Sequence, residues 1–385
     1  MSGFVGLHLG AGQHSESLLP QYKKLAKDAC KTAQGILRSG GSAVTACTEA
    51  TAILENSPLT NAGFGSNLTW DGRVECDASV MDGENLVHGA IGAVPGVKNP
   101  VFLARHLCLK QNARLALGRV PPSFLVGEGA RLEAVQAGIP TIPPEEMISP
   151  RADKLHHKCR KEVHKFNQLQ KKNSKFDTVG AVCIDSYGRV AAACSSGGIT
   201  LKVRGRVGQA GVYGCGCWAE RSTDSLPAVA TCTSGCGEYL IRTTMAQGAA
   251  MAARNNVNAE QGVHQYMMKD FLGSPFLENV DKLGGVIVLK CHPAEETGEF
   301  LWAHTTKSML VASMSTLDDR TRVRLSVLDS PNHVGKSLVV QGIPFKFKRQ
   351  LALPRVLVAS AELEVNTGSS TSRSSSPIAG DGSNT

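Results

Sequence analysis

The hydrophobic and polar residues of this chain follow two patterns, one typical of strands and one typical of amphipathic helices. Successive apolar residues predict a short strand at 4–9, which ends in Gly10-Ala11-Gly12. Apolar residues then recur at steps of three or four through 20–38, and Gly40-Gly41 ends this helix. Ser42 is a plausible cap for the next one. The same patterns predict further helices at 42–56, 100–111, 127–138, 243–255 and 259–271, and strands at 178–184, 190–194, 284–291, 299–305 and 308–314.

The order of these elements is strand, helices, strands, helices, strands. Two separate groups of helices fit a layered α/β sandwich better than a regular βαβ winding. We predict one such domain built from residues 1–150 and 178–365, interrupted by a flexible, exposed linker at 151–177 that is helical in part. A Ser-, Thr- and Gly-rich tail at 366–385 is expected to be disordered.

Most of the positive charge lies in the linker. The chain has a formal net charge of +8, and residues 151–175 contain nine Lys or Arg against two acidic residues. The rest of the chain is close to neutral, so we expect no direct binding of nucleic acid. No apolar run reaches the roughly 18 residues of a membrane-spanning helix, so we expect no membrane partner.

Thr178 is the candidate nucleophile. The sequence Asp177-Thr178-Val179-Gly180 marks an abrupt change from the basic linker to a strand of small and apolar residues. A cut before Thr178 would give this residue a free amine beside its own hydroxyl, so that one residue is both nucleophile and base. The twelve cysteines are expected to be reduced thiols, and Cys183, Cys194 and Cys232 lie in apolar runs typical of a core.

Three later segments carry the groups that a catalytic threonine needs. Ser195-Ser196-Gly197-Gly198 ends the neighbouring strand, and a short hairpin turn would bring Ser196 to the start of the first strand. Arg206 lies between glycines and is suited to hold a carboxylate through two parallel hydrogen bonds. The turn at 233–238 could direct backbone N–H groups at an oxyanion. Taken singly, each segment is more often an ordinary turn or loop.

Two other interpretations are weaker. Gly214-Cys215-Gly216-Cys217 could suggest a metal pair or a thiol switch, but no second Cys or His pair at zinc spacing accompanies it. The chain also lacks a strand followed by Gly-x-Gly-x-x-Gly and a downstream acidic residue, so a dinucleotide loop is not indicated. We therefore predict no metal and no cofactor.

Together and in this order, the segments resemble the N-terminal-nucleophile hydrolases of the plant-type asparaginase and glycosylasparaginase group. The resemblance extends over most of residues 4–315. Its motifs are Asn61-Ala62-Gly63-x-Gly65, Cys76 to Gly83, Lys98-Asn99-Pro100, Thr178 to Val182, Ser195 to Gly198, Gly205 to Gly208 and Gly235-x-Gly237-Glu238.

The resemblance implies a four-layer αββα sandwich and self-cleavage between Asp177 and Thr178, which gives an α chain (1–177) and a β chain (178–385). It also implies the roles of individual residues. The implied catalytic residues are Thr178, Ser196, Ser234 and Gly235, with the Ser234-Gly235 turn at the oxyanion, and the implied substrate-binding residues are Arg206, Gln209, Gly237 and Asn61.

The chain departs from the small-molecule members of this group at Gln209. Those enzymes usually have an Asp there, which pairs with the free α-amine of an amino-acid substrate. A neutral Gln would remove the reason to require a free amine. This departure, with the motifs at 121–129, 213–220 and 234–238, resembles the threonine-aspartase branch of the family.

That branch implies an endopeptidase that cleaves after aspartate in nuclear transcription regulators. The alternative is a small-molecule asparaginase or isoaspartyl peptidase. A non-catalytic binding protein with the same fold is a further possibility. The expected partners are protein substrates, an αβ heterodimer that pairs into an α2β2 tetramer, and a nuclear import receptor that binds 158–175. The expected location is the nucleus and cytoplasm.

Overall fold

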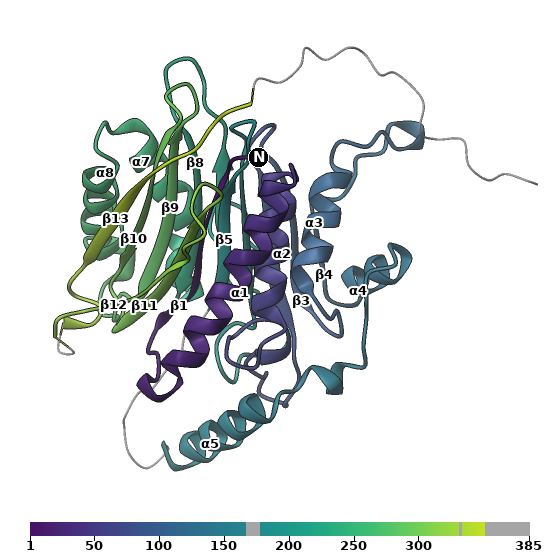
Figure 1. Cartoon of the computed structure of the whole chain (residues 1–385). Helices are drawn as coiled ribbons and strands as arrows, with labels where there is room; N and C mark the ends of the chain where they lie inside the picture. Colours follow the sequence, from purple (N-terminus) through teal and green to yellow (C-terminus); the bar gives the residue numbers. More distant parts are fainter. Residues whose placement is uncertain (167–177, 331–332, 351–385) are drawn as a thin grey trace, which may run out of the picture. The chain divides into compact units, whose positions relative to one another are not determined.

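A computed structural model of the chain describes residues 1–166, 178–330 and 333–350 (Figure 1), of which residues 1–350 form one compact unit. Two sheets make up its centre. The eight-stranded sheet has the order β12-β11-β1-β5-β6-β2-β3-β4, and the five-stranded sheet has the order β13-β10-β9-β8-β7. Neighbouring strands are antiparallel except for the parallel pair β3 and β4.

The strands of the larger sheet are β1 (Phe4–Gly12), β2 (Cys76–Asp82), β3 (Val87–Val94), β4 (Phe124–Val126), β5 (Val179–Ile184), β6 (Val190–Ser196), β11 (Ser308–Ser315) and β12 (Arg322–Val327). Those of the smaller sheet are β7 (Cys217–Glu220), β8 (Ala228–Gly235), β9 (Gly284–His292), β10 (Thr297–His304) and β13 (Val339–Lys346).

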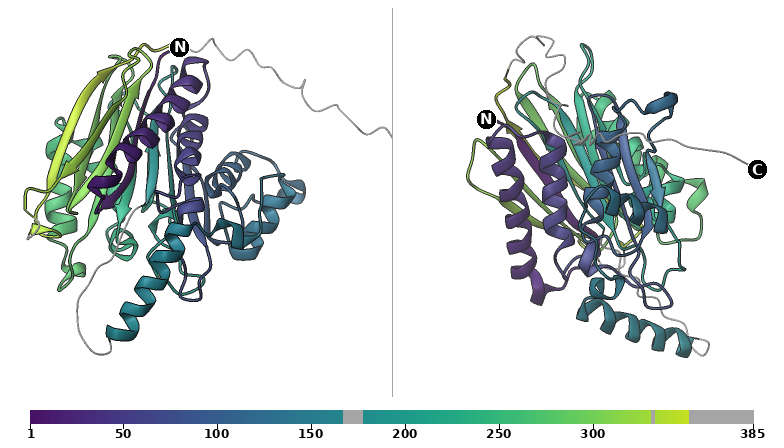
Figure 2. Two further views of the ribbon diagram at one scale, coloured as in Figure 1. Left: turned by 60° about the horizontal axis from the view of Figure 1, so that its bottom comes forward. Right: turned by 90° about the vertical axis from the view of Figure 1, so that its right-hand side faces the viewer.

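Helices cover the outer face of each sheet, as the views of Figure 2 show. The larger sheet packs against α1 (Leu19–Arg38), α2 (Ala43–Glu55) and α3 (Pro100–Lys110). The smaller sheet packs against α7 (Met245–Asn255) and α8 (Ala259–Tyr266). The result is helices, sheet, sheet, helices, which confirms the predicted four-layer αββα sandwich.

The sequence explains where two of these helices begin and end. The side chain of Ser42 accepts a hydrogen bond from the Thr45 N–H at the start of α2, as a cap residue does. Gly40 follows the end of α1 with a φ of 88°, a left-handed conformation that favours glycine. Backbone groups at these helix ends that have no partner within the helix are therefore partly satisfied by Ser42 and Gly40, the residues predicted from the sequence.

The two sheets approach each other closely because their central strands carry small residues. A Cβ added at Gly6 of β1 would lie 2.2 Å from the Phe300 ring of β10, and one added at Gly180 of β5 would lie 2.1 Å from Cys232 Sγ of β8. Cys183, Cys194 and Cys232 are fully buried, as their apolar neighbours predicted. Strands that are covered on both faces read as continuous apolar runs, which is the pattern at 178–184.

The remaining helices are α4 (Gly127–Gln136), α5 (Pro150–Phe166) and α6 (Gly237–Arg242). Helix α5 occupies the first part of the segment 151–177, which we expected to be a flexible, exposed linker that is helical in part. Its Ala152 and His156 are buried, and the Arg160 guanidinium lies 5.4 Å from the centre of the Trp70 ring. These contacts stabilise a helix in a segment whose many charges favour an exposed linker.

The rest of the predicted linker and the predicted tail at 366–385 lie outside the described residues. Within the described ranges, none of the helices combines the length and the apolar character that crossing a bilayer requires.

Candidate active site

The candidate site lies where several strands end at one edge of the sandwich. β5 begins directly after Thr178, and its antiparallel neighbours β1 and β6 end at Gly12 and Ser196. In the β5–β6 pair Val179 is opposite Ser195, which brings Thr178 next to Ser196. The hairpin turn after β5 is therefore what joins the two hydroxyl residues, as the sequence predicted.

Thr178 is the centre of a hydrogen-bond chain. Its side chain is nearly buried, and Oγ donates to Ser196 Oγ over 3.0 Å. Gln209 Nε2 donates to the same Thr178 Oγ over 3.0 Å, and the Gly198 N–H donates to Ser196 Oγ over 3.0 Å. Thr178 Oγ, the candidate nucleophile, therefore has one donor and one acceptor in fixed positions, both of them neutral.

Asn61 supports the turn that follows Ser196. Its side-chain N–H donates to the Gly198 carbonyl over 2.8 Å, and its side-chain oxygen accepts from the Asn67 N–H over 2.8 Å. The Gly197 N–H in turn donates to the Asn61 carbonyl. Asn61 thus holds the Gly197-Gly198 turn, and its predicted contact with substrate stays a prediction.

Arg206 lies in the same site and is paired along one edge of its guanidinium. Nε donates to Glu238 Oε1 over 2.9 Å, and Nη2 donates to Glu238 Oε2 over 2.8 Å. This arrangement engages the Nε–Nη2 edge and leaves the Nη1 end of the group for another acceptor. Arg206 is only 14% exposed, whereas Glu238 is 45% exposed. Glu238 is the last residue of the motif Gly235-x-Gly237-Glu238, but its pairing with Arg206 was not predicted from the sequence.

Glycines surround the Arg206 guanidinium. A Cβ added at Gly198 would lie 2.8 Å from Nη1, one at Gly208 would lie 2.7 Å from Nη1, and one at Gly237 would lie 2.7 Å from Nη2. The Gly237 Cβ would also lie 2.8 Å from Gln209 Oε1. Gly237, predicted to bind substrate, therefore has a physical role in the site: it leaves room for Arg206 and Gln209.

Two acidic residues at the start of β2 and just before it hold the loop that carries Arg206. Asp77 accepts from the Gly208 N–H over 2.8 Å and from the Ala93 N–H over 2.8 Å, and Glu75 accepts from the Gly205 N–H over 2.8 Å. Burial raises the pKa of Asp77, and the charge of Lys202 and these backbone donors act in the opposite direction. Asp77 belongs to the motif Cys76 to Gly83, but no role for it was predicted from the sequence.

Ser234 and Gly235 end β8, beside the end of β1. Ser234 Oγ accepts from the Ala11 N–H over 2.8 Å, so its hydroxyl joins the two strands. Gly235 has a φ of 146°, and a Cβ there would lie 2.5 Å from the Leu283 carbonyl oxygen. Only glycine fits this close approach of the two backbones. The predicted contribution of this turn to an oxyanion site stays a prediction.

His8 of β1 was missed by sequence analysis. Its ring is fully buried beside Thr178, and it hydrogen-bonds to the backbone of that residue. Nδ1 accepts from the Gly10 N–H over 3.3 Å, and Nε2 lies 3.2 Å from Cys232 Sγ. Burial lowers the pKa of His8 to about 3. The ring is therefore neutral near pH 7 and positions the nucleophile's backbone without charge.

Asp177, on the other side of the predicted self-cleavage bond, lies outside the described residues. Within the described ranges no group of three or more His, Cys, Asp or Glu side chains is arranged to hold a metal ion. Cys215 and Cys217 are both buried in the core.

Comparison with known proteins gives this arrangement a family. The family model described as "Asparaginase" matches residues 2–323. The chain belongs to the asparaginase family. It is therefore a member of the N-terminal-nucleophile hydrolases, in agreement with the αββα sandwich and with a threonine at the start of a central strand.

Relatives within the asparaginase family cover most of this chain. It is 36% identical over 296 residues to the mouse "Isoaspartyl peptidase/L-asparaginase", which covers 74% of this chain and 82% of the relative. The human protein of the same name is 35% identical over 301 residues, which cover 78% of this chain and 89% of the human protein. The "Isoaspartyl peptidase" of Salmonella typhimurium is 36% identical over 258 residues, which cover 64% of this chain and 77% of the Salmonella protein.

Proposed function

We propose that this protein is a threonine endopeptidase of the threonine aspartase (taspase) type, which cuts itself before Thr178 and then hydrolyses peptide bonds after aspartate. The observation that carries the proposal is Gln209. This neutral side chain donates to Thr178 Oγ at the position where, by resemblance, small-molecule relatives carry an Asp.

The charges around the nucleophile support a substrate without a free amine. Arg206 can hold one carboxylate through its Nη1 end. The three nearby carboxylates that the site description names are already engaged, Asp77 and Glu75 by backbone N–H groups and Glu238 by Arg206. A free ammonium group of an amino acid would therefore lose water without gaining a dedicated partner, whereas an acylated nitrogen within a polypeptide has no such charge to satisfy.

Self-cleavage would use Thr178 as an internal nucleophile. Oγ attacks the carbonyl carbon of Asp177, and the acyl group moves from nitrogen to oxygen to give an ester. Water then hydrolyses the ester, releases the Asp177 carboxylate and frees the Thr178 amine. A free α-amine has a pKa of about 7.7–8.0, so a useful fraction is neutral near pH 7 and can accept a proton.

Turnover of a substrate repeats the same chemistry. The freed amine takes the proton of Thr178 Oγ, which attacks the carbonyl carbon of a substrate aspartate whose side chain is held by Arg206. The peptide nitrogen leaves with a proton, and water hydrolyses the acyl-enzyme ester. Ser196 and Gln209 hold Oγ in place for the attack, since both are 3.0 Å from it.

The second candidate function is that of a small-molecule isoaspartyl peptidase or asparaginase. The names of the mouse, human and Salmonella relatives favour it. Both candidates use the same nucleophile, the same self-cleavage and the same carboxylate anchor. They differ in what the site does with the substrate α-nitrogen, and Gln209 is where that difference would reside.

The test offers both substrate classes to the processed protein. One substrate is a peptide with a single internal aspartate, and the others are a β-aspartyl dipeptide and free asparagine. The proposal expects cleavage of the peptide after aspartate by the wild type and none by Thr178→Ala, which should also stay uncut by intact mass. Efficient hydrolysis of the dipeptide with an intact internal peptide would establish the second candidate instead.

Gln209→Asp provides the matched comparison. This change replaces a donor to Thr178 Oγ by a carboxylate that can pair with an ammonium group. We expect it to weaken cleavage of the internal peptide and to favour the β-aspartyl dipeptide. Equal peptide cleavage by the variant and the wild type would remove Gln209 as the basis of the proposal.

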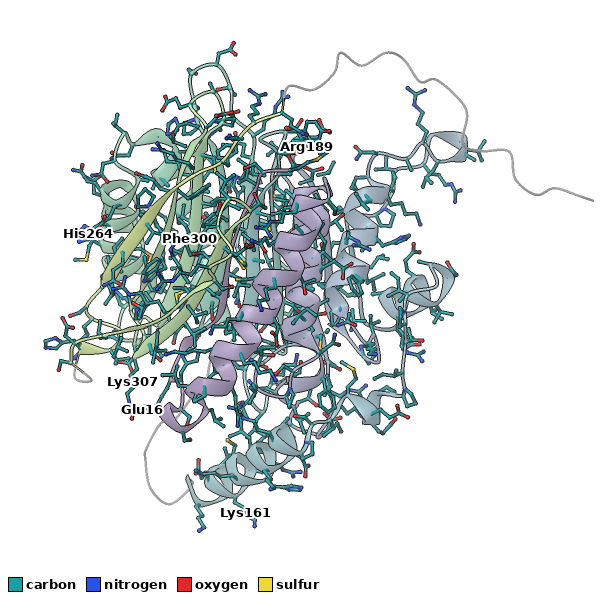
Figure 3. All side chains as sticks on the ribbon, in the orientation of Figure 1. Glu16, Lys161, Arg189, His264, Phe300 and Lys307 are labelled. Atoms are coloured by element: carbon teal, nitrogen blue, oxygen red, sulfur yellow. The ribbon has the colours of Figure 1, made fainter. Side chains whose placement is uncertain are left out.

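We also propose that the substrates are nuclear transcription regulators, that processed αβ units pair into an α2β2 tetramer, and that residues 158–175 bind an import receptor. Lys158 and Lys161 of α5 are exposed, whereas Arg160 contacts Trp70; Figure 3 labels Lys161. The test of import replaces Lys158 and Lys161 by Gln in the tagged full chain. Unchanged nuclear accumulation would contradict a role for this part of the segment.

A further inference from the structure

A second cavity lies at the edge of the sandwich and is lined by positive charge. Its volume is about 790 Å³, and its cationic side chains come from α1 and from β12 with the turn before it. These six cations are Lys23, Lys27, Lys31, Arg320, Arg322 and Arg324. Phe300 and Trp302 of β10 form the aromatic part of the wall, and Figure 3 labels Phe300.

Little negative charge compensates these cations. Asp319 is the one acidic residue in the lining, and it pairs with Arg38, whose nitrogen is 2.6 Å away. Arg322 pairs with Asp318 over 3.0 Å. The other five cations have no ion pair with any described residue, so the cavity has a strong net positive charge.

Trp302 forms a buried part of the cavity wall and carries one of its cations. The side chain is 2% exposed, and the Arg324 guanidinium carbon lies 5.6 Å from the centre of its ring. The indole Nε1 has no acceptor among the described residues, but the unpaired Gln341 Oε1 belongs to the residue directly opposite in the β10–β13 pair. The indole N–H is therefore no evidence for a ligand, and the case for one rests on the charge of the cavity.

Protection of a sheet edge does not explain these features. β12 is the edge strand of its sheet, and charged side chains on edge strands commonly prevent aggregation. That role needs charge at the surface, but it does not need a cavity of this size or the three lysines of α1 that face it.

We propose that this cavity binds an acidic peptide segment of the protein substrate, an inference that rests on the proposed endopeptidase function. An extended peptide can pair with the free edge of β12, because an edge strand offers unpaired backbone groups. Its carboxylates would face Arg320, Arg324 and the lysines of α1.

Two other occupants fit less well. A second copy of this chain in a two-fold contact would place the same six cations against each other. Single-stranded nucleic acid is typically bound by aromatic faces on which bases stack, but Trp302 and Phe300 are 2% and 1% exposed and offer no such face.

The cavity is within reach of a substrate held at Thr178. Strand order places β12 three strands from β5, which is about 14 Å across the sheet at the usual strand spacing. The register places Arg324 and Arg322 level with Gly180 and Val182, so they also lie about 7 and 13 Å along the strands from Thr178. The combined separation is about 16–19 Å, which roughly five or six extended residues span at about 3.3 Å per residue. An acidic segment a few residues from the cleaved aspartate could therefore occupy the cavity during the reaction.

The test measures binding without catalysis. The probe is a fluorescently labelled decapeptide that alternates Glu and Ser and contains no Asp, followed by anisotropy with the full-length processed protein. The cavity variant is Lys23→Gln/Lys27→Gln/Lys31→Gln. The control is Lys24→Gln/Lys269→Gln/Lys336→Gln, which removes the same charge at exposed residues outside the cavity lining.

We expect the cavity variant to bind the peptide at least tenfold more weakly, and the control to bind within twofold of the wild type. Equal losses in the cavity and control variants would overturn the proposal, because they indicate general charge attraction. Tighter binding of an oligonucleotide of equal charge, or dimerisation through this face, would also overturn it.

A substrate assay separates this proposal from the endopeptidase proposal. Two peptides with the same internal aspartate are compared, one with an acidic segment five residues away and one with Ser in its place. The cavity variant should raise KM for the acidic peptide only. If neither peptide is cleaved but the probe still binds selectively, the proposed function fails while the cavity retains its assignment as an acidic-peptide site.

Discussion

Glu238→Gln tests how the carboxylate anchor is aligned. The substitution keeps the size of the side chain but removes its charge and one of the two acceptors that Arg206 uses. If Glu238 positions Arg206, the Nη1 end of the guanidinium is no longer held toward the substrate. We therefore expect weaker binding of an aspartate substrate, with little change in the chemical step.

The structure sets the size of this effect. Hydrogen bonds to charged groups contribute about 1.5–3 kcal/mol when they are well shielded, whereas exposed ion pairs contribute about 0.2–1 kcal/mol. Arg206 is 14% exposed and Glu238 is 45% exposed, which places the pair between these cases. A discounted value of about 1–2 kcal/mol corresponds to a rise in KM of roughly 5–30-fold.

Partial burial would raise the pKa of Glu238, but the nearby Arg206 charge and hydrogen bonds outweigh it and the pKa is lowered. Glu238 is therefore ionised near neutral pH, and the Gln variant removes a full charge. The assay is steady-state cleavage of a peptide with one aspartate, beside an otherwise identical asparagine peptide. Glu128→Gln, which breaks the exposed pair with Arg131, is the matched control and should leave KM unchanged.

A lower KM in Glu238→Gln would refute the reasoning. That result would mean that Glu238 competes with the substrate carboxylate for Arg206. An unchanged KM would mean that the glycine-lined pocket alone holds the guanidinium.

Three further predictions concern the same site. Arg206→Ala should self-process normally but lose its preference for aspartate, which cleavage of an Asp, Asn and Ala peptide series would measure. Ser196→Ala should lower kcat by roughly 10–100-fold with little change in KM, because Thr178 Oγ loses its acceptor; a KM effect alone would place Ser196 in substrate binding. The pKa of His8 is about 3, below its ordinary 6.5, so its neutral form contributes stability above pH 6.5 that is lost as pH falls toward 3. Urea unfolding between pH 6.5 and 4.5 measures how the free energy of unfolding changes with pH. This change should be less steep in His8→Gln than in the wild type by about 1.4 kcal/mol per pH unit, and equal pH slopes would contradict this.

The sequence predicted the central part of this site because its geometry is local. Thr178 and Ser196 are 18 residues apart and are joined by one hairpin, so strand pairing alone brings them together. Helices with a regular apolar spacing were also predicted, and α1 and α2 begin and end within a residue or two of the predicted ranges.

The rest of the site depends on contacts that periodicity does not encode. Glu238 follows Arg206 by 32 residues, and the two meet only because the loop of Arg206 and the start of helix α6 reach the same edge of the sandwich. His8 reads as one residue of an apolar strand; the pairing of β1 with β5 places it opposite Gly180, and its ring reaches the Thr178 backbone from there. The position of helix α5 within the basic segment was not predicted, because its buried face is small: Ala152 packs in a minor cluster with Leu68, and Arg160 lies over Trp70.

One feature of the continuous chain has a consequence for the self-cleavage that we propose. Thr178 Oγ and its two hydrogen-bond partners, Ser196 and Gln209, already stand in place while the polypeptide is continuous. All three belong to one molecule, so cutting needs no encounter with a second copy. Processing should therefore proceed with first-order kinetics, and its half-time should stay the same when the precursor is diluted a hundredfold.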